Sequence, residues 1–223
     1  MRLNLWECSK TMNASAYPNT QTQLDEVAAT LKKGGVAIFP TDTVYDLGCS
    51  IKHPEAIQRI FKMKNRPMDQ SLPMVISRPE VALEIAEFRD KDLETLKKIW
   101  PGPWTLIARA RVSLPEGLKS PIDGTVALRC PDHGLALEIL RKCGDTLAVS
   151  SANFSGGHSP AKFEDIPEDL LSIADNAIDA GACPLGGETA IARIEPHHIR
   201  IIRTGCVSAE ELNRVEVLLG KLL

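Results

Sequence analysis

Four short segments of this 223-residue chain carry side chains that could do chemistry, and each lies where an expected strand or helix ends. They cover residues 40–48, 64–67, 124–131 and 150–157. The first segment holds two threonines, an aspartate and a tyrosine after a buried strand, at the strand end where α/β sheets usually bind ligands. Threonine and aspartate also cap ordinary turns, so this segment by itself does not establish a site.

The other three segments add positive charge and groups that bind anions. Lys64 and Arg66 follow an expected helix, where the helix dipole favours cations even without a ligand. The same pair also suits a polyphosphate, because arginine donates two parallel bonds and lysine acts as a point charge. The loop over 150–157 has glycines and small polar side chains that let backbone N–H groups approach an anion. Arg129, near the end of an apolar strand, needs an anionic partner or a route to water.

Five motifs occur along the chain in a fixed order. They are Phe39-Pro40-Thr41-Asp42-Thr43-Val44-Tyr45, Lys64-x-Arg66-Pro67, Trp100-Pro101-Gly102-Pro103-x-Thr105, Val126-Ala127-Leu128-Arg129-x-Pro131-Asp132-His133 and Ser150-Ser151-Ala152-Asn153-x-Ser155-Gly156. Together, from about residue 24 to about residue 206, these motifs resemble the YrdC/TsaC family of threonylcarbamoyl-AMP synthases of the compact, single-domain type.

The resemblance implies a nucleotidyltransferase that acts in tRNA modification. Such an L-threonylcarbamoyladenylate synthase forms threonylcarbamoyl-AMP and pyrophosphate from L-threonine, bicarbonate and ATP. The resemblance also implies Mg²⁺ bound to the ATP and no metal site built from protein side chains. A tRNA threonylcarbamoyltransferase complex would then receive the product, so we expect no strong direct binding of nucleic acid.

The resemblance also assigns roles to residues of this chain. On the threonine side it implies Thr41, Thr43, Tyr45, Arg129 and Thr189. On the ATP side it implies Lys64, Arg66, Ser151, Asn153 and Arg203, with Lys64 and Arg66 as the catalytic residues. Because both reactants are anions, positive charge and positioning could supply most of the rate enhancement without a covalent nucleophile.

The chain departs from the family pattern in three places. Asp46 stands where the family usually has glycine, which adds negative charge near the threonine carboxylate. Gln70 lies in a stretch where the family usually has a further cation, and Thr189-Ala190 replaces part of a usual Glu-Ser-Thr. These departures leave open whether the substrate or the activity has changed.

Two other functions therefore stay open. A carbamoyl-adenylate-forming enzyme would share the nucleotide residues but would not need a threonine pocket. A noncatalytic RNA- or nucleotide-binding paralogue would need no turnover at all. The net charge of −3 and the aromatic content of 4% argue against the second alternative, because RNA binders usually present basic surfaces and stacking aromatics.

The elements that must position these residues alternate between strands and helices. We expect helices over 22–33, 54–63, 90–99 and 134–143, one starting near Pro79 and one starting at Ser208. We expect strands over 36–39, 73–77, 104–109, 125–130, 146–150, 176–179, 189–194 and 198–203. This order predicts an α/β fold with a twisted, mixed parallel and antiparallel sheet flanked by helices, and the family resemblance implies three layers.

Composition sets the remaining limits. The chain is 43% hydrophobic and 25% charged, which is typical of a globular protein, and we divide it into an extension over 1–20 and a single domain over 21–223. Its six cysteines form no C-x-x-C pair and fit neither a disulfide framework nor a zinc site. Because no signal peptide or run of 18 apolar residues occurs, we expect a soluble, cytoplasmic protein that does not span a membrane.

Overall fold

A computed structural model describes residues 20–223 of the chain, so the predicted extension over 1–20 lies almost entirely outside the described residues. The helices are α1 (Thr20–Lys32), α2 (Pro54–Lys64), α3 (Glu80–Ile85), α4 (Leu93–Ile99), α5 (Gly134–Lys142), α6 (Glu168–Ile173) and α7 (Ala209–Leu219). The strands are β1 (Val36–Pro40), β2 (Tyr45–Ser50), β3 (Met74–Ile76), β4 (Trp104–Arg109), β5 (Thr125–Arg129), β6 (Thr146–Ser151), β7 (Asn176–Ala177), β8 (Ala190–Ile194) and β9 (Ile199–Arg203).

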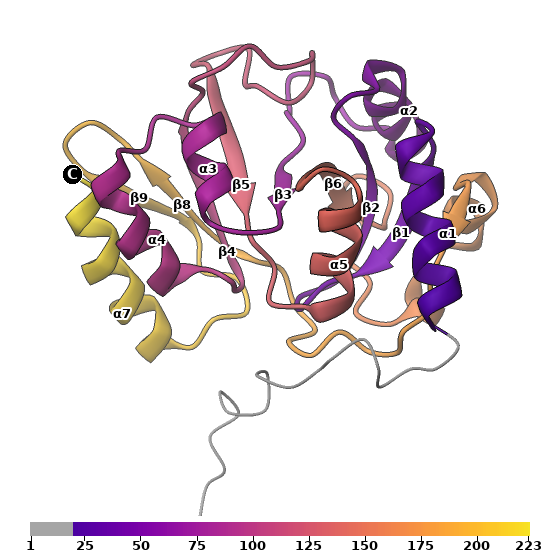
Figure 1. Ribbon diagram of the computed structural model, residues 1–223. Coiled ribbons are helices and arrows are strands. Elements are labelled where there is room, and N and C mark those ends of the chain that lie inside the picture. The colour runs from indigo at the N-terminus through magenta and orange to yellow at the C-terminus, as the bar shows by residue number, and fades with distance from the viewer. Residues whose placement is uncertain (1–19) are drawn as a thin grey trace, which may run out of the picture.

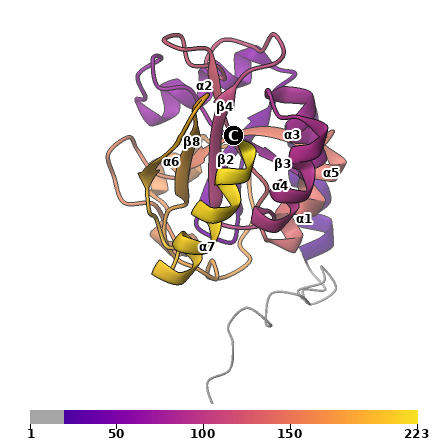
Figure 2. The ribbon, with the colours of Figure 1, turned by 90° about the vertical axis from the view of Figure 1, so that its left-hand side faces the viewer.

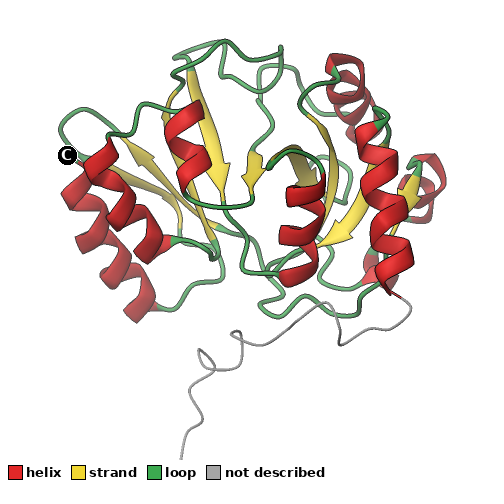
Figure 3. Cartoon of the chain, in the orientation of Figure 1, coloured by secondary structure: helices red, strands yellow, loops and turns green. Residues whose placement is uncertain are grey.

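In the described part of the chain these strands form one nine-stranded sheet in the order β7-β1-β2-β6-β3-β5-β4-β8-β9. The pairs β1/β7, β3/β5 and β4/β8 are parallel, and the other neighbours are antiparallel (Figure 3). Helices cover both faces of the sheet: α1 and α5 pack on one face, and α2, α3, α4, α6 and α7 pack on the other, where α4 and α7 lie next to each other (Figure 2). The prediction of a mixed sheet flanked by helices is confirmed.

Two elements were not predicted from the sequence. The segment expected as a ligand-binding loop continues into strand β2, which pairs with β1 on one side and β6 on the other. Asp46 and Gly48 interrupt its apolar pattern, which hid the strand. Gly48 is needed there because a Cβ atom would lie 2.8 Å from the Phe39 ring on β1. Helix α6 was also missed, since it is a single short stretch of six residues.

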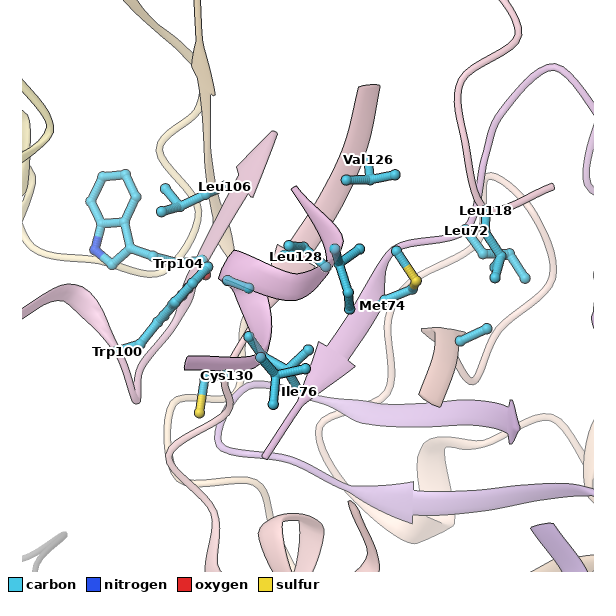
Figure 4. Packing of buried hydrophobic residues seen from close by; sticks show 14 of the residues in the cluster. Leu72, Met74, Ile76, Trp100, Trp104, Leu106, Leu118, Val126, Leu128 and Cys130 are labelled. Atoms are coloured by element: carbon cyan, nitrogen blue, oxygen red, sulfur yellow. The ribbon is translucent and has the colours of Figure 1, made fainter. Parts of the chain in front are cut away.

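The buried side chains form two clusters. The smaller one joins α1 and α5, which lie side by side in Figure 1, to residues of β1, β3 and β6. The larger one takes in side chains from α2, α3, α4 and α7 and from most of the sheet. Figure 4 shows its centre, where Trp100 and Trp104 lie close to Leu106 and Leu128. Burying such large side chains contributes roughly 1.5–3 kcal/mol each to folding.

The alternation of side chains along a strand separates this core from the opposite face of the sheet. On β4, Trp104 and Leu106 are buried in the larger cluster, while Thr105 points the other way. On β8, Ala190 and Ala192 are likewise in the cluster, while the residues between them face outward. At β4 and β8 the second face of the sheet is therefore available to build a site, while α1 and α5 cover it at β1, β3 and β6.

Between Thr20 and the C-terminus, none of the helices has both the length and the apolar character that a bilayer crossing requires.

Gly205 offers a test of the turn that follows β9. It has a φ of +61°, and a Cβ atom there would lie 2.3 Å from the carbonyl carbon of Thr189. We predict that Gly205→Ala lowers the free energy of unfolding by roughly 2–5 kcal/mol, from the left-handed backbone and the clash together. Urea denaturation would measure the loss.

Gly124→Ala is the matched control for this substitution. Gly124 has a similar φ of +69°, but no atom lies within 4 Å of a Cβ atom built there. This variant should lose only about 1–2 kcal/mol, the cost of the backbone conformation. If both variants lose the same free energy of unfolding, the close approach of Thr189 does not prevent a side chain at position 205.

Candidate functional site

The second face of the sheet borders a cavity of about 750 Å³. Its lining side chains come from all strands but β1 and β7 in the described part of the chain, from the end of α2, from the turn between β1 and β2, from the loops after α2, β4 and β6, and from the segment before β8. The volume lies within the roughly 300–1,000 Å³ that small-molecule sites usually have. Residues from Thr43 to Arg203 contribute, so the cavity collects segments that are distant in sequence.

The structure brings most of the predicted site residues to this cavity. Those that line it are Thr43, Lys64, Arg66, Arg129, Ser151, Asn153, Thr189 and Arg203. Thr41 and Tyr45 are not among the lining residues, so the expectation that they line a threonine pocket does not match the geometry. The structure has no ligand in it, and the roles assigned to the other eight residues stay predictions.

Thr41 and Tyr45 instead support the segments around the cavity. The Thr41 hydroxyl donates to the carbonyl oxygen of Val44 at 2.8 Å and closes the turn between β1 and β2. The Tyr45 hydroxyl donates to the carbonyl of Gly181 at 2.7 Å and accepts from the amide of Ala180 at 3.1 Å. Burial raises the pKa of Tyr45, which keeps it neutral. Both side chains are fully buried, and their predicted roles on the threonine side stay predictions.

The end of α2 aims two cations at the cavity. Pro54 suits the first turn of the helix, since it needs no amide hydrogen there. Asn65 ends the helix in the left-handed conformation, with φ 52°, and the amide of Arg66 then donates to the carbonyl of Phe61 at 2.9 Å. As a result, Lys64 and Arg66 both line the cavity although they are separated by one residue.

Lys64 is the more deeply buried of the two, with only 2% of its surface exposed. Its ammonium group donates to the backbone carbonyls of Ser151 and Asn153, and to the Asn153 side-chain oxygen at 3.3 Å. Burial, assisted by the nearby Arg66, lowers the pKa of Lys64 to about 8, and Asp46 opposes the shift. Lys64 is therefore still mostly charged at neutral pH.

The amide and hydroxyl groups beyond β6 are arranged by the same contacts. The Ser151 hydroxyl donates to the side-chain oxygen of Asn153. The side-chain nitrogen of Asn153 donates in turn to the carbonyl of Gly157 at 2.6 Å. These bonds close the loop over Lys64 and fix the shape of the predicted phosphate-binding segment.

Among the residues that the structure describes, five cations line the cavity, and they differ in their partners. Three form ion pairs: Arg129 with Asp42, Arg193 with Asp123, and Arg203 with Glu188. Lys64 and Arg66 donate instead to neutral oxygens, and for Arg66 these are the carbonyls of Gln70 at 2.8 Å and Ser71 at 3.1 Å. A carbonyl satisfies a hydrogen bond without cancelling the charge, so Lys64 and Arg66 keep positive charge available for an anion.

The ion pair between Arg129 and Asp42 is almost completely buried, with side-chain exposures of 5% and 4%. Arg129 also donates to the carbonyl of Gly102 at 3.4 Å. These contacts connect β5 to the turn between β1 and β2 and to the segment before β4. Breaking such a pair leaves a buried charge without compensation, which typically costs about 3–5 kcal/mol.

Hydroxyl groups and a carboxylate connect β4, β8 and β9 at the other end of the cavity. The hydroxyls of Thr105 and Thr189 are 3.0 Å apart. Arg203 donates to the Thr189 carbonyl at 2.8 Å and to its hydroxyl at 3.1 Å. Glu188 bonds both Arg203 and the hydroxyl of Ser159, the latter at 3.0 Å. Thr189 therefore stays in the site despite the altered motif around it.

Asp46 places a negative charge among these cations. Its side chain lines the cavity, although only 5% of the residue is exposed. Among the described residues its Oδ2 atom has no hydrogen-bond partner. Burial raises the pKa of Asp46 to about 6, with a contribution from Asp42, while Arg129 and Lys64 act in the opposite direction.

The sequence analysis did not select several residues that the cavity uses. Asp42 was noted within its motif but was not proposed as the partner of Arg129. Thr105 and Arg193 were also not selected, although both lie on predicted strands at positions that alternate with core residues. That alternation was the signal that could have identified them.

Comparison with known proteins shows which family the chain belongs to. The family model Sua5/YciO/YrdC, described as "Telomere recombination", matches residues 29–205. The chain is 33% identical to the threonylcarbamoyl-AMP synthase of Bacillus subtilis over 86% of its own length and 56% of that protein. It is 30% identical to that of Xanthomonas campestris pv. campestris (strain B100), over 82% of this chain and 94% of that one.

Among solved structures, Pyrococcus abyssi Sua5 complexed with L-threonine is similar to this chain, with a TM-score of 0.79 and 32% identity. The match covers 86% of this chain and 56% of the Pyrococcus chain. The chain thus spans about half the length of several curated relatives that it matches, and nearly the whole of the Xanthomonas one.

The burial of Lys64 predicts an effect on stability. Lys64→Ala would leave the buried carbonyls of Ser151 and Asn153 without their donor, so we expect a loss of about 1–3 kcal/mol in the free energy of unfolding. Lys62→Ala, on the exposed side of the same helix, should change it by less than about 0.5 kcal/mol. Urea denaturation of both variants gives the comparison, and similar effects would refute the structural role of Lys64.

The raised pKa of Asp46 predicts a pH dependence of stability. Between its ordinary value of 3.8 and about 6, the folded protein binds more protons at Asp46 than the unfolded chain does. Stability from this group therefore falls as pH rises through that window, by about 3 kcal/mol in total. Asparagine does not ionise, so Asp46→Asn should remove this pH-dependent loss. The free energy of unfolding of the variant should therefore rise relative to that of the wild type as the pH increases from 4 to 7. Urea denaturation at several pH values measures the free energy of unfolding of both proteins. A difference between the two proteins that does not change with pH would contradict the prediction.

Proposed function

Because the chain belongs to the Sua5/YciO/YrdC family, we propose that it is an L-threonylcarbamoyladenylate synthase, which forms threonylcarbamoyl-AMP and pyrophosphate from L-threonine, bicarbonate and ATP. The single observation that carries the proposal is the shared cavity. Lys64, Arg66, Ser151 and Asn153 all line it, and among the described residues neither of these two cations forms an ion pair with a carboxylate. The names of the Bacillus and Xanthomonas relatives and the threonine complex of the Pyrococcus relative support the same activity.

The proposed reaction has two bond-forming steps. The threonine amine first adds to CO₂ derived from bicarbonate and gives a carbamate. A carbamate oxygen then attacks the α-phosphorus of ATP, and the bond from that phosphorus to the pyrophosphate oxygen breaks. Lys64 and Arg66 would bind the phosphates and stabilise the charge that grows on the leaving oxygen. Binding both anions in one cavity also removes most of the cost of bringing them together.

The threonine end of the cavity would lie near Thr43, Arg129 and Thr189. Arg129 is held by Asp42, so its remaining donors would bind the threonine carboxylate or the carbamate. Thr189 is held in turn by Thr105 and Arg203. Thr41 and Tyr45 would act indirectly, by supporting the turns around the site.

Mg²⁺ would enter bound to ATP and neutralise phosphate charge, with most of its ligands supplied by phosphate and water oxygens. Within residues 20–223 no three His, Cys, Asp or Glu side chains are grouped so that they could hold a metal ion. The product would pass to a tRNA threonylcarbamoyltransferase complex in the cytoplasm, without strong binding of tRNA by this chain itself.

Pyrophosphate release tests the proposal. We predict release from ATP that requires both L-threonine and bicarbonate. Arg66→Ala should lower kcat/KM by roughly 10²–10³, because it removes one charged contact to the phosphates. Arg200→Ala is the matched control, since Arg200 is an exposed arginine that lies outside the cavity, and it should retain full activity.

Other results would favour the alternatives. Release that needs bicarbonate or carbamoyl phosphate but is indifferent to threonine would indicate a carbamoyl-adenylate-forming enzyme. ATP binding without any release would indicate a noncatalytic paralogue.

A further inference from the structure

A carboxylate in a cavity that must bind anions is an unexpected feature, and Asp46 is the one with the greatest burial among those that line it. The chain keeps this group despite the cost of removing it from water. A purely structural role would require partners, yet the Oδ2 atom has none among the described residues.

The position of Asp46 is set by the sheet. On β2 it lies opposite Ser151 of β6 and Phe39 of β1, and it shares the cavity with Ser151. Lys64 at the end of α2 and Arg129 on β5 attract its negative charge, and Asp42 in the preceding turn repels it. The thiol of Cys183 is a further ionisable group close enough to sense the charge, but burial raises its pKa to about 12 and keeps it neutral. Asp46 therefore lies between the predicted phosphate cations and the predicted threonine end.

We propose that Asp46 binds the amino group of the amino-acid substrate and accepts its proton as the carbamate forms. This inference rests on the function proposed above. Of the groups in that reaction, the ammonium of threonine is the organic cation, and a carboxylate is the side chain that recognises it. Arg129 and Lys64 would meanwhile bind the carboxylate and the phosphates, so the three charges would orient the substrate along the cavity.

The proposed step balances as follows. The ammonium first loses one proton to solvent. The lone pair of the neutral amine then forms a bond to the carbon of CO₂, and one C–O π bond shifts its electrons to oxygen. The nitrogen of this adduct is positively charged and loses its second proton to the Asp46 carboxylate, which gives a carbamate with a neutral N–H nitrogen and the negative charge on its carboxylate oxygens. Asp46 then returns the proton to water.

The groups around Asp46 predict the pH profile of the reaction. Asp46 must be ionised to accept a proton, and its pKa of about 6 sets an acid limb. Lys64 must be protonated to bind phosphate, and its pKa of about 8 sets an alkaline limb. The wild-type enzyme should therefore show a bell-shaped profile of kcat/KM for threonine between these two values.

Asp46→Asn and Asp46→Gly test the proposal by kinetics. Both should lower kcat/KM for threonine by about 10²-fold or more and lose the acid limb, while KM for ATP stays within about twofold. The alkaline limb should remain, because Lys64 is unchanged. Asp165→Asn, which removes an exposed carboxylate outside the cavity, should leave both limbs in place. Urea denaturation checks that each variant is folded. If Asp46→Asn does not fold, the kinetic test uses Asp46→Gly.

A binding measurement separates this inference from the proposed function. Isothermal titration calorimetry with L-threonine and with 3-hydroxybutyrate, its analogue without the amino group, reports recognition of the amine directly. The wild type should prefer threonine by about tenfold or more, and Asp46→Asn should lose that preference. If the wild type releases pyrophosphate with threonine but both Asp46 variants keep its kinetics and its preference, the inference is wrong and the function stands. If the wild type shows no threonine-dependent release, the function fails, and the calorimetric preference alone decides whether Asp46 recognises an amine.

Discussion

The buried ammonium group of Lys64 is the interaction on which the site depends. A charge this deep in the protein is costly unless its hydrogen bonds are satisfied, and the carbonyls of Ser151 and Asn153 satisfy them. Because carbonyl groups are neutral, the charge is held in place without being cancelled. The same bonds connect the end of α2 to the loop after β6, so the feature that retains the charge also shapes the wall of the cavity.

The ion-paired arginines have a different role from that of Lys64. Arg129 with Asp42 joins β5 to the turn between β1 and β2, which are well separated in the sheet order, while Arg203 with Glu188 joins β9 to the segment before the neighbouring strand β8. Together these pairs hold both ends of the cavity in a defined geometry. Their charge is largely compensated, so they contribute orientation more than net attraction. The cavity thus combines a region of uncompensated positive charge with a region of directed hydrogen bonds, and Asp46 lies between the two.

Much of this arrangement could be predicted from the sequence, and the errors have physical causes. The strands over 104–109 and 125–130 and the helix over 54–63 follow directly from periodicity, and residues of the loop motifs line one cavity, as the sequence led us to expect. Strand β2 was not predicted because its pairing with two neighbours overrides a polar local sequence. Tyr45 was placed in the pocket because a motif shows which residues occur together but does not show which face of a strand each one occupies. The carbonyl partners of Lys64 have no sequence signal, since every residue has a backbone oxygen.

The spread of the cavity residues along the chain has a consequence for biosynthesis. The lining begins at Thr43 and is completed only by Arg203 on the edge strand β9. A nascent chain that has not yet exposed this last strand outside the ribosome lacks one side of the site, however well its first strands have already paired. Contacts this distant in sequence also form late and slowly. The protein would therefore complete this cavity only after Arg203 has been synthesised and has left the ribosome.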